Sequence, residues 1–275
     1  MSTILALSLA GSPGVTTTAL GLAMSWPQSV MLIEADPSRY SSVLPGFFRG
    51  QLAHARSIGE LAVTSNNLGS LDINQIWAQS ISLVDEAVEG QERRLVAGFK
   101  DPAAARAMDP VWGQLGTAAS SFEGMGMDVI FDAGRWTVGD TRSALLRIAD
   151  AILIVARPTL PDIVAVHKRL PAIRAELAVN GRESSITLVL VETNTGPQLS
   201  SAETRKALGV DRVVRIAWDD KSASVFSLGE PAPRKFEKTK LSRSLRAAID
   251  TIRTQLADQR TRLDQNRGIE TETRR

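Results

Sequence analysis

Residues 4–23 read Ile4-Leu-Ala-Leu-Ser-Leu-Ala-Gly-Ser-Pro-Gly-Val-Thr-Thr-Thr-Ala-Leu-Gly-Leu-Ala23, and this stretch decides the fold. Its first part, residues 4–9, is a short apolar run typical of a buried parallel strand. A loop of glycine, serine and proline follows, and residues 16–24 are predicted to form a helix that packs back on the strand. Such a unit can hold a phosphate group, because loop amides and the helix N-terminus direct their N–H groups at one point. The alternative is an ordinary strand-turn-helix without a ligand.

The loop departs from the P-loop pattern G-x-x-x-x-G-K-[ST]. With Gly14 as the second glycine and Thr16 as the hydroxyl residue, Val15 occupies the lysine position. Leu9 occupies the position of the first glycine. Valine has neither a charge nor a donor for a phosphate oxygen, whereas the hydroxyls of Thr16 and Thr17 and most loop amides are kept. We therefore expect a phosphate cradle that lacks its main cation.

Further apolar runs along the chain predict one large α/β domain. Strands are expected at residues 4–9, 30–33, 95–99, 127–131, 151–155, 186–191 and 213–216. Helices are expected at residues 16–24, 58–63, 109–122, 140–148, 161–177 and 241–263, and Ser57 and Glu60 are expected to form a capping box. Strands that alternate with helices predict a mainly parallel central sheet with helices on both faces. Residues 40–92 give no regular arrangement beyond that box.

Acidic residues follow two of the predicted strands. Asp36 comes just after the second strand, and Asp132 follows the fourth within the sequence Asp-Ala-Gly-Arg. Ligands bind at the carboxyl ends of parallel strands, and a carboxylate there can reach magnesium through water, as in a Walker B site. The alternatives are an ordinary Asp-Pro turn at Asp36 and a helix cap or loop aspartate at Asp132.

Composition excludes several classes of protein. The 275 residues include no cysteine, which excludes disulfides and thiolate metal sites. His54 and His167 lie far apart without the spacing of a zinc site. A net charge of +2 gives no strong overall field for nucleic acid. No apolar run approaches the roughly 20 residues that span a bilayer, and the N-terminal run lacks a basic leader, so we expect a cytoplasmic protein.

The C-terminal part of the chain is basic. Six cations fall within residues 234–246, with Glu237 the only acid: Arg234, Lys235, Lys238, Lys240, Arg243 and Arg246. Arg234, Lys235, Lys238, Lys240 and Arg243 are candidates for contact with DNA phosphates or anionic lipid, and a solvated face is the alternative. We expect the main domain to cover residues 1–255. Residues 256–275 are expected to be a projecting helix end and a charged tail, disordered from Asn266.

Four segments in this order resemble one family. Residues 10–23, 30–37, 128–135 and 149–158 together look like the MinD/ParA family of deviant Walker A P-loop proteins, and the resemblance extends to residues 218–221 and 228–231. The family's loop reads K-G-G-x-G-K-[ST]-[ST], where the second lysine binds nucleotide in its own chain and the first reaches across a dimer. By position these lysines are Val15 and Ala10 here, and both are missing.

The resemblance implies a ligand set of ATP or ADP with Mg²⁺. By matching position, the nucleotide contacts are Gly11, Ser12, Gly14, Val15, Thr16 and Thr17, and the magnesium contacts are Thr16, Asp36 and Asp132. Glu34 departs from the aspartate usual in the region that polarises the attacking water. With the loop cations gone, hydrolysis is expected to be weak or absent, unless Arg39 or Arg135 substitutes. Nucleotide binding is expected to be weak, or absent altogether.

For function, the altered loop resembles that of the pilus-assembly localisation proteins of the TadZ/CpaE type, which keep the family fold. This resemblance implies a degenerate positioning or scaffold factor, homodimeric, with a protein partner of a positioning or secretion system that can recruit it to a membrane or pole. One alternative is an active ParA-like partition ATPase that binds nonspecific DNA. Another is a metabolic enzyme on the same fold, disfavoured because none of the seven lysines lies in the first 99 residues.

Overall fold

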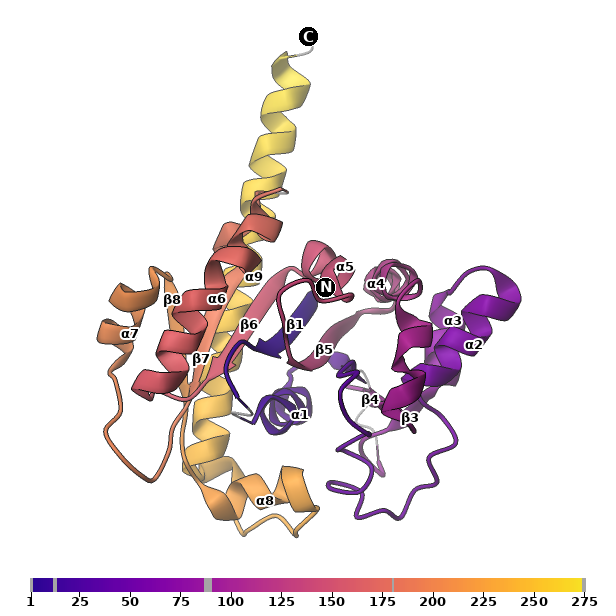
Figure 1. Ribbon diagram of the computed structural model, residues 1–275, viewed down its shortest axis with the longest axis horizontal. Coiled ribbons are helices and arrows are strands. Elements are labelled where there is room, and N and C mark those ends of the chain that lie inside the picture. Colours follow the sequence, from indigo (N-terminus) through magenta and orange to yellow (C-terminus); the bar gives the residue numbers. More distant parts are fainter. Residues whose placement is uncertain (1, 12–13, 87–90, 180, 274–275) are drawn as a thin grey trace.

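The computed structural model describes residues 2–11, 14–86, 91–179 and 181–273, with side chains left out at 123, 184 and 262–273. Within these ranges eight strands form one sheet in the order β3-β4-β2-β5-β1-β6-β7-β8 (Figure 1). Every neighbouring pair is parallel except β3 and β4. The strands are β1 (Thr3–Ser8), β2 (Ser29–Glu34), β3 (Ser80–Ser82), β4 (Arg93–Val96), β5 (Met127–Arg135), β6 (Ala151–Ala156), β7 (Ile186–Val191) and β8 (Arg212–Ile216). The predicted fold class is confirmed.

Helices cover both faces of the sheet (Figure 1). They are α1 (Val15–Ser25), α2 (Ile58–Leu68), α3 (Ile73–Ala78), α4 (Trp112–Ser120), α5 (Ser143–Ile148), α6 (Leu160–Ala178), α7 (Ser201–Leu208), α8 (Asp220–Leu228) and α9 (Lys240–Thr273). Short 3-10 helices are η1 (Pro102–Met108), η2 (Ser121–Met125), η3 (Glu183–Ser185) and η4 (Phe236–Lys238). Among the strands and α-helices, β3, α3, α7 and α8 are absent from our prediction.

Two apolar clusters form the core, one on each face of the sheet. In β1, Leu5 and Leu7 join the cluster that includes residues of α2, α4, α5 and α6, whereas Ile4 and Ala6 join the cluster of α1, α8 and α9. This alternation follows the two-residue period of a strand. Burying each large apolar side chain stabilises the fold by roughly 1.5–3 kcal/mol, so the central strands are firmly held.

Two local features differ from the sequence-based prediction. Strand β5 continues through the Asp-Ala-Gly segment to Arg135, where we expected it to end at residue 131. Helix α2 begins after Ser57 as predicted, but the expected capping box is wrong, because the Ser57 side chain makes no capping bond. Glu60 instead pairs with Lys100 at 2.7 Å. True capping boxes open α3, at Asp72, and α7.

Helix α9 packs on the sheet with its first half and then extends beyond it (Figure 1). Leu245, Ile249, Ile252 and Leu256 are buried as predicted, whereas the side chain of Leu263 lies outside the described ones. Helix α9 is assigned as far as Thr273, and the disordered tail expected from residue 266 stays a prediction. The domain boundary after residue 255 remains a prediction. Among the described residues, no helix is long and apolar enough to cross a membrane.

Candidate phosphate and magnesium site

The glycine loop enters α1 through a left-handed residue. Gly14 has φ +88° and ψ +36°, a conformation that glycine adopts without a steric penalty, and α1 begins at the next residue. The first turn of α1 has no side-chain cap and no acidic residue. Its amide N–H groups and the positive end of the helix dipole therefore favour an anion at this position. Gly11 is exposed, and Ser12 lies outside the described residues.

Both positions that would carry the loop lysines are packed into the core. Ala10 is 3 % exposed in one apolar cluster, and Val15 is 6 % exposed in the cluster on the other face of the sheet. Arg169 of α6 donates to the backbone oxygen of Leu9 and ties the start of the loop to that helix. Apolar packing thus occupies the places from which a family lysine would reach phosphate.

Asp132 lies on β5 beside the first turn of α1. Its carboxylate forms a side-chain hydrogen bond with Thr16 and accepts the amide of Gly134 at 3.0 Å. Burial raises the pKa of Asp132 to about 7, and the nearby carboxylates of Glu34 and Asp36 add to this effect, while the bonds to Thr16 and Gly134 oppose it. The structure therefore brings together the predicted magnesium residues Thr16, Asp36 and Asp132.

Asp36 follows β2 and faces the same strand end. One of its oxygens accepts the backbone amide and the hydroxyl of Ser38, at 2.9 and 2.6 Å. Its other oxygen lies against Gly134, which has φ +55°. Asp36 is 8 % exposed, so its position is set by the turn that follows β2 and by the glycine on β5.

Glu34 has a structural role that the sequence did not indicate. It pairs in register with Asp132 on the neighbouring strand, but its oxygens accept four bonds elsewhere. These come from the hydroxyl of Ser41 and the amides of residues 42, 43 and 98. Glu34 thus fastens the segment after β2 to the end of β4, and its acceptor sites are largely occupied by protein donors.

Arg142 is a site residue that sequence reasoning missed. Its side chain is 1 % exposed and donates to the backbone oxygens of Ala35, Ala133 and Arg135. Its partner is Asp140 at 2.7 Å, and although burial disfavours the charged form, the bonds from Arg142 hold the pKa of Asp140 below its usual value. The guanidinium carbon also lies 4.7 Å from the ring centroid of Trp136. Arg142 thereby joins the ends of β2 and β5, which carry the two aspartates.

The donor set suits magnesium held jointly with a phosphate group. Among the described residues, no group of three or more histidine, cysteine, aspartate or glutamate side chains could hold a metal by itself. Mg²⁺ is commonly bound through one or two carboxylates together with waters and substrate phosphates. Thr16, Asp132 and Asp36 supply one hydroxyl and two carboxylates, so they fit an ion that arrives with a nucleotide. The exposed Arg39 comes after β2, and the exposed Arg135 is the last residue of β5.

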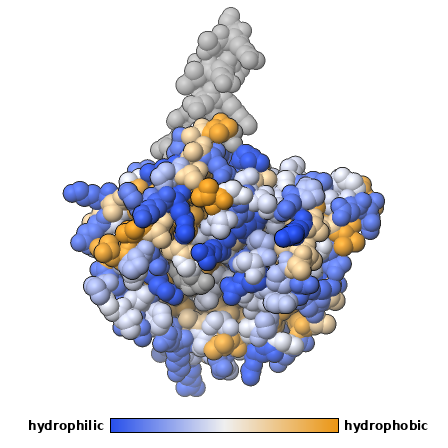
Figure 2. Space-filling model, viewed as in Figure 1, coloured by the Kyte–Doolittle hydropathy of each residue, from blue (hydrophilic) through white to orange (hydrophobic). Residues whose placement is uncertain are grey.

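The basic residues of the C-terminal segment gather around a second surface feature. A hollow of about 420 Å³ is lined by Lys221, Lys238, Lys240 and Arg243, with Trp218, Asp219, Ser222, Pro233 and Thr239. Trp218 is 40 % exposed, an unusual degree for an indole. Three of the five predicted contact residues therefore lie together, whereas Arg234 and Lys235 do not line the hollow. Figure 2 shows mostly polar residues on the face viewed, with apolar ones in small separate groups.

No protein-family model and no curated protein sequence matches the chain. Solved structures do match: a ParA family ATPase from Chlorobium tepidum has a TM-score of 0.68 at 16 % identity, covering 90 % of this chain and 98 % of that one. MinD in the MinC–MinD complex from Aquifex aeolicus has a TM-score of 0.65 at 16 % identity, covering 94 % of this chain and 96 % of that one. A Cyanothece McdA variant in complex with ATP has a TM-score of 0.65 at 17 % identity, covering 94 % of this chain and 96 % of that one. By its structural similarity to these proteins, this chain has the fold of the ParA and MinD ATPases.

Proposed function

We propose that this protein is a positioning or scaffold factor that binds a magnesium nucleotide weakly and hydrolyses it feebly or not at all. The observation that carries the proposal is the contrast between two parts of one site. Thr16 and Asp132 remain hydrogen-bonded beside the first turn of α1, while Val15 and Ala10 stand buried among apolar side chains. Backbone amides can hold a phosphate, but phosphoryl transfer needs cations that stabilise the developing charge.

The similar structures support the same class of role. A septum site-determining protein MinD and a plasmid partition protein share this fold, and McdA was solved with ATP. We extend this to a homodimer that acts through a protein partner, since MinD was solved in a complex with MinC. The machine that is positioned is proposed to be a Tad-type pilus or secretion system. Recruitment to a membrane or cell pole would come through the partner, from the cytoplasm.

Calorimetric titration with ATP and ADP, each with and without Mg²⁺, tests the nucleotide site. We expect weak binding that requires Mg²⁺ and falls about tenfold in Thr16→Ala, because a hydrogen bond to a charged group contributes roughly 1.5–3 kcal/mol. Thr261→Ala, on an exposed turn of α9, is the matched control and should bind like the native chain. Absence of binding, or binding unaffected by Thr16→Ala, would refute the nucleotide site.

A second candidate function is DNA binding through the hollow lined by Lys221, Lys238, Lys240 and Arg243. Among the described residues these four cations have no ion-pair partner within 4.0 Å, which leaves them available for phosphates. Duplex DNA titrated at two salt concentrations tests it. Salt-sensitive binding that requires nucleotide and weakens in Lys240→Gln would favour the partition ATPase. No binding of DNA at low salt would exclude the partition ATPase, and the scaffold role would be the remaining proposal.

A further inference from the structure

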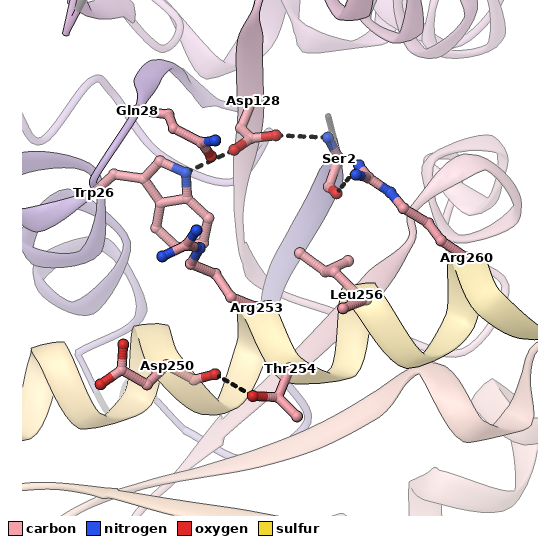
Figure 3. Close-up of a pocket in the computed structure, with 10 residues that line it drawn as sticks. Ser2, Trp26, Gln28, Asp128, Asp250, Arg253, Thr254, Leu256 and Arg260 are labelled. Carbon is pink, nitrogen blue, oxygen red and sulfur yellow. Dashed lines mark hydrogen bonds between the residues drawn. The ribbon is translucent and has the colours of Figure 1, made fainter.

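A hollow of about 440 Å³ lies at the edge of the sheet where the parallel strands begin, away from the glycine loop at their carboxyl ends (Figure 3). Its lining comes from four segments: Ser2 before β1, Trp26 and Gln28 before β2, Asp128 on β5, and a row of residues on α9. The residues of α9 are Asp250, Arg253, Thr254, Leu256, Ala257 and Arg260. None of these residues belongs to the candidate phosphate site.

The floor of this hollow is fixed by a buried hydrogen-bonded group. Asp128 is 4 % exposed, and its two oxygens accept the amide of Ser2 at 2.6 Å and the indole Nε1 of Trp26 at 2.8 Å. Leu256 supplies buried apolar surface beside it. Protein donors bond both oxygens of Asp128 and hold its carboxylate in one position. The floor is therefore preorganised.

The wall formed by α9 presents the positive groups. Arg253 and Arg260 are seven residues apart, two turns along one side of the helix, and both are exposed. Arg260 donates to the hydroxyl of Ser2 at 3.0 Å and so leans over the floor. Within the described part of the chain, Arg253 and Gln28 have no side-chain partner. Figure 3 shows Arg253 extending from α9 toward Trp26, with Gln28 above them.

We propose that this hollow binds a small organic anion, one that carries a carboxylate or a phosphate ester on a compact body. The charged group would accept hydrogen bonds from the guanidinium of Arg253 and the amide of Gln28, near Arg260. The body of the ligand would lie over Trp26 and Leu256. Asp250 lines the hollow one turn before Arg253, so the anionic group belongs at the end away from it. The guanidinium of Arg253 is suited to a carboxylate or a phosphate ester, because its N–H donors match the spacing of the oxygens in either group.

Titration with citrate and with inorganic phosphate at constant ionic strength tests the proposal, followed by the NMR signal of the Trp26 indole N–H. Trp26→Phe assigns that signal. We expect a saturable shift with at least one anion, and binding about tenfold weaker in Arg253→Gln, since a charge-assisted hydrogen bond is removed. Arg205→Gln removes the same charge from an exposed position on α7, outside both hollows, and should bind like the native chain. A response to citrate alone assigns a carboxylate ligand, and one to phosphate alone a phosphate ester.

Two results would overturn the proposal: no saturable shift with either anion, or equal affinity in Arg253→Gln and the native chain. The Thr16→Ala variant separates this site from the glycine loop, because phosphate could bind there as well. A response lost in Thr16→Ala but kept in Arg253→Gln would belong to the loop, and the hollow would then carry no ligand site. A response kept in Thr16→Ala and lost in Arg253→Gln supports the hollow, whatever the outcome for nucleotide.

Discussion

A Cβ atom on Gly134 would lie 2.0 Å from Oδ2 of Asp36. Asp36 follows β2 and Gly134 lies near the end of the neighbouring strand β5, and the missing side chain of Gly134 makes room for the carboxylate of Asp36. Gly134 also has φ +55°, and its amide donates to Asp132. This glycine therefore determines how closely the two aspartates of the candidate site approach each other.

Gly134→Ala should disturb the site and destabilise the protein by about 1–3 kcal/mol, because the new Cβ displaces Asp36 and the residue keeps a positive φ. Urea denaturation measures the loss. Gly139→Ala is the matched control, since Gly139 has φ +74° but no atom within 4 Å of a built Cβ. The difference between the two variants isolates the contact with Asp36. Equal losses would show that the contact has no energetic role.

Arg142→Met should cost about 3–5 kcal/mol, because it leaves Asp140 buried without its partner and several backbone oxygens without a donor. Arg142→Met combined with Asp140→Leu should recover much of that loss, since the uncompensated charge is removed as well. Arg147→Met, at an exposed position on α5, is the control and should change stability little. Thermal and urea denaturation of the four proteins measure these differences. A loss below about 1 kcal/mol for Arg142→Met would contradict this role.

The raised pKa of Asp132 predicts a definite pH dependence without ligand. The folded state holds the proton up to about pH 7, whereas the unfolded chain releases it near 3.8. Between these values the folded state binds more protons, so the free energy of unfolding should fall as pH rises, by at most about 4 kcal/mol. In Asp132→Asn this component should be absent. A native chain and variant with parallel stability-versus-pH curves would contradict the raised pKa.

Bound magnesium nucleotide should offset part of the fall in the free energy of unfolding that occurs as pH rises. The ion competes with the proton for Asp132, so the rise in melting temperature caused by Mg²⁺ and ADP should be larger at pH 8 than at pH 6. Asp132→Asn should show a smaller rise at both pH values and little dependence on pH. Calorimetric melting curves at fixed nucleotide concentration measure this. A rise that is larger at pH 6 would mean that the carboxylate of Asp132 does not face the ion.

Val15→Lys should tighten nucleotide binding about tenfold if the cradle has kept its shape, because an ammonium group would then reach the phosphates. The aliphatic part of lysine can replace the buried valine while its end extends to the loop. Val15→Met is the control for the longer side chain without the charge. Ala10→Lys can be added to test the position that would reach a partner chain. No gain over Val15→Met would mean that the loop has lost the cradle geometry.

The sequence predicted those parts of the fold that local pattern determines. The strands β1, β2, β6 and β7 are mostly apolar and almost fully buried, so their sequences predict them, and the loop that follows β1 could be predicted from its glycines. The contact between Thr16 and Asp132 was also predictable, because both residues lie at the carboxyl edge of a parallel sheet, where the strand ends come together.

The remaining features depend on contacts between distant residues. Arg142 bonds the backbone of Ala35, 107 positions away, and a single arginine in a polar stretch gives no sign of such burial. Glu34 looks like an altered catalytic position until its bonds to residues 41–43 are seen. Strand β3 has three residues, too few for a periodic signal. The hollow beside Arg253 joins four segments that are well separated along the chain.

ATP turnover by the purified protein, measured beside nucleotide binding on the same sample, tests the central claim most directly. The account predicts weak binding of magnesium nucleotide and turnover no faster than that of Asp132→Ala, because the loop has kept its amides and lost its cations. Brisk turnover that Asp132→Ala abolishes would contradict it.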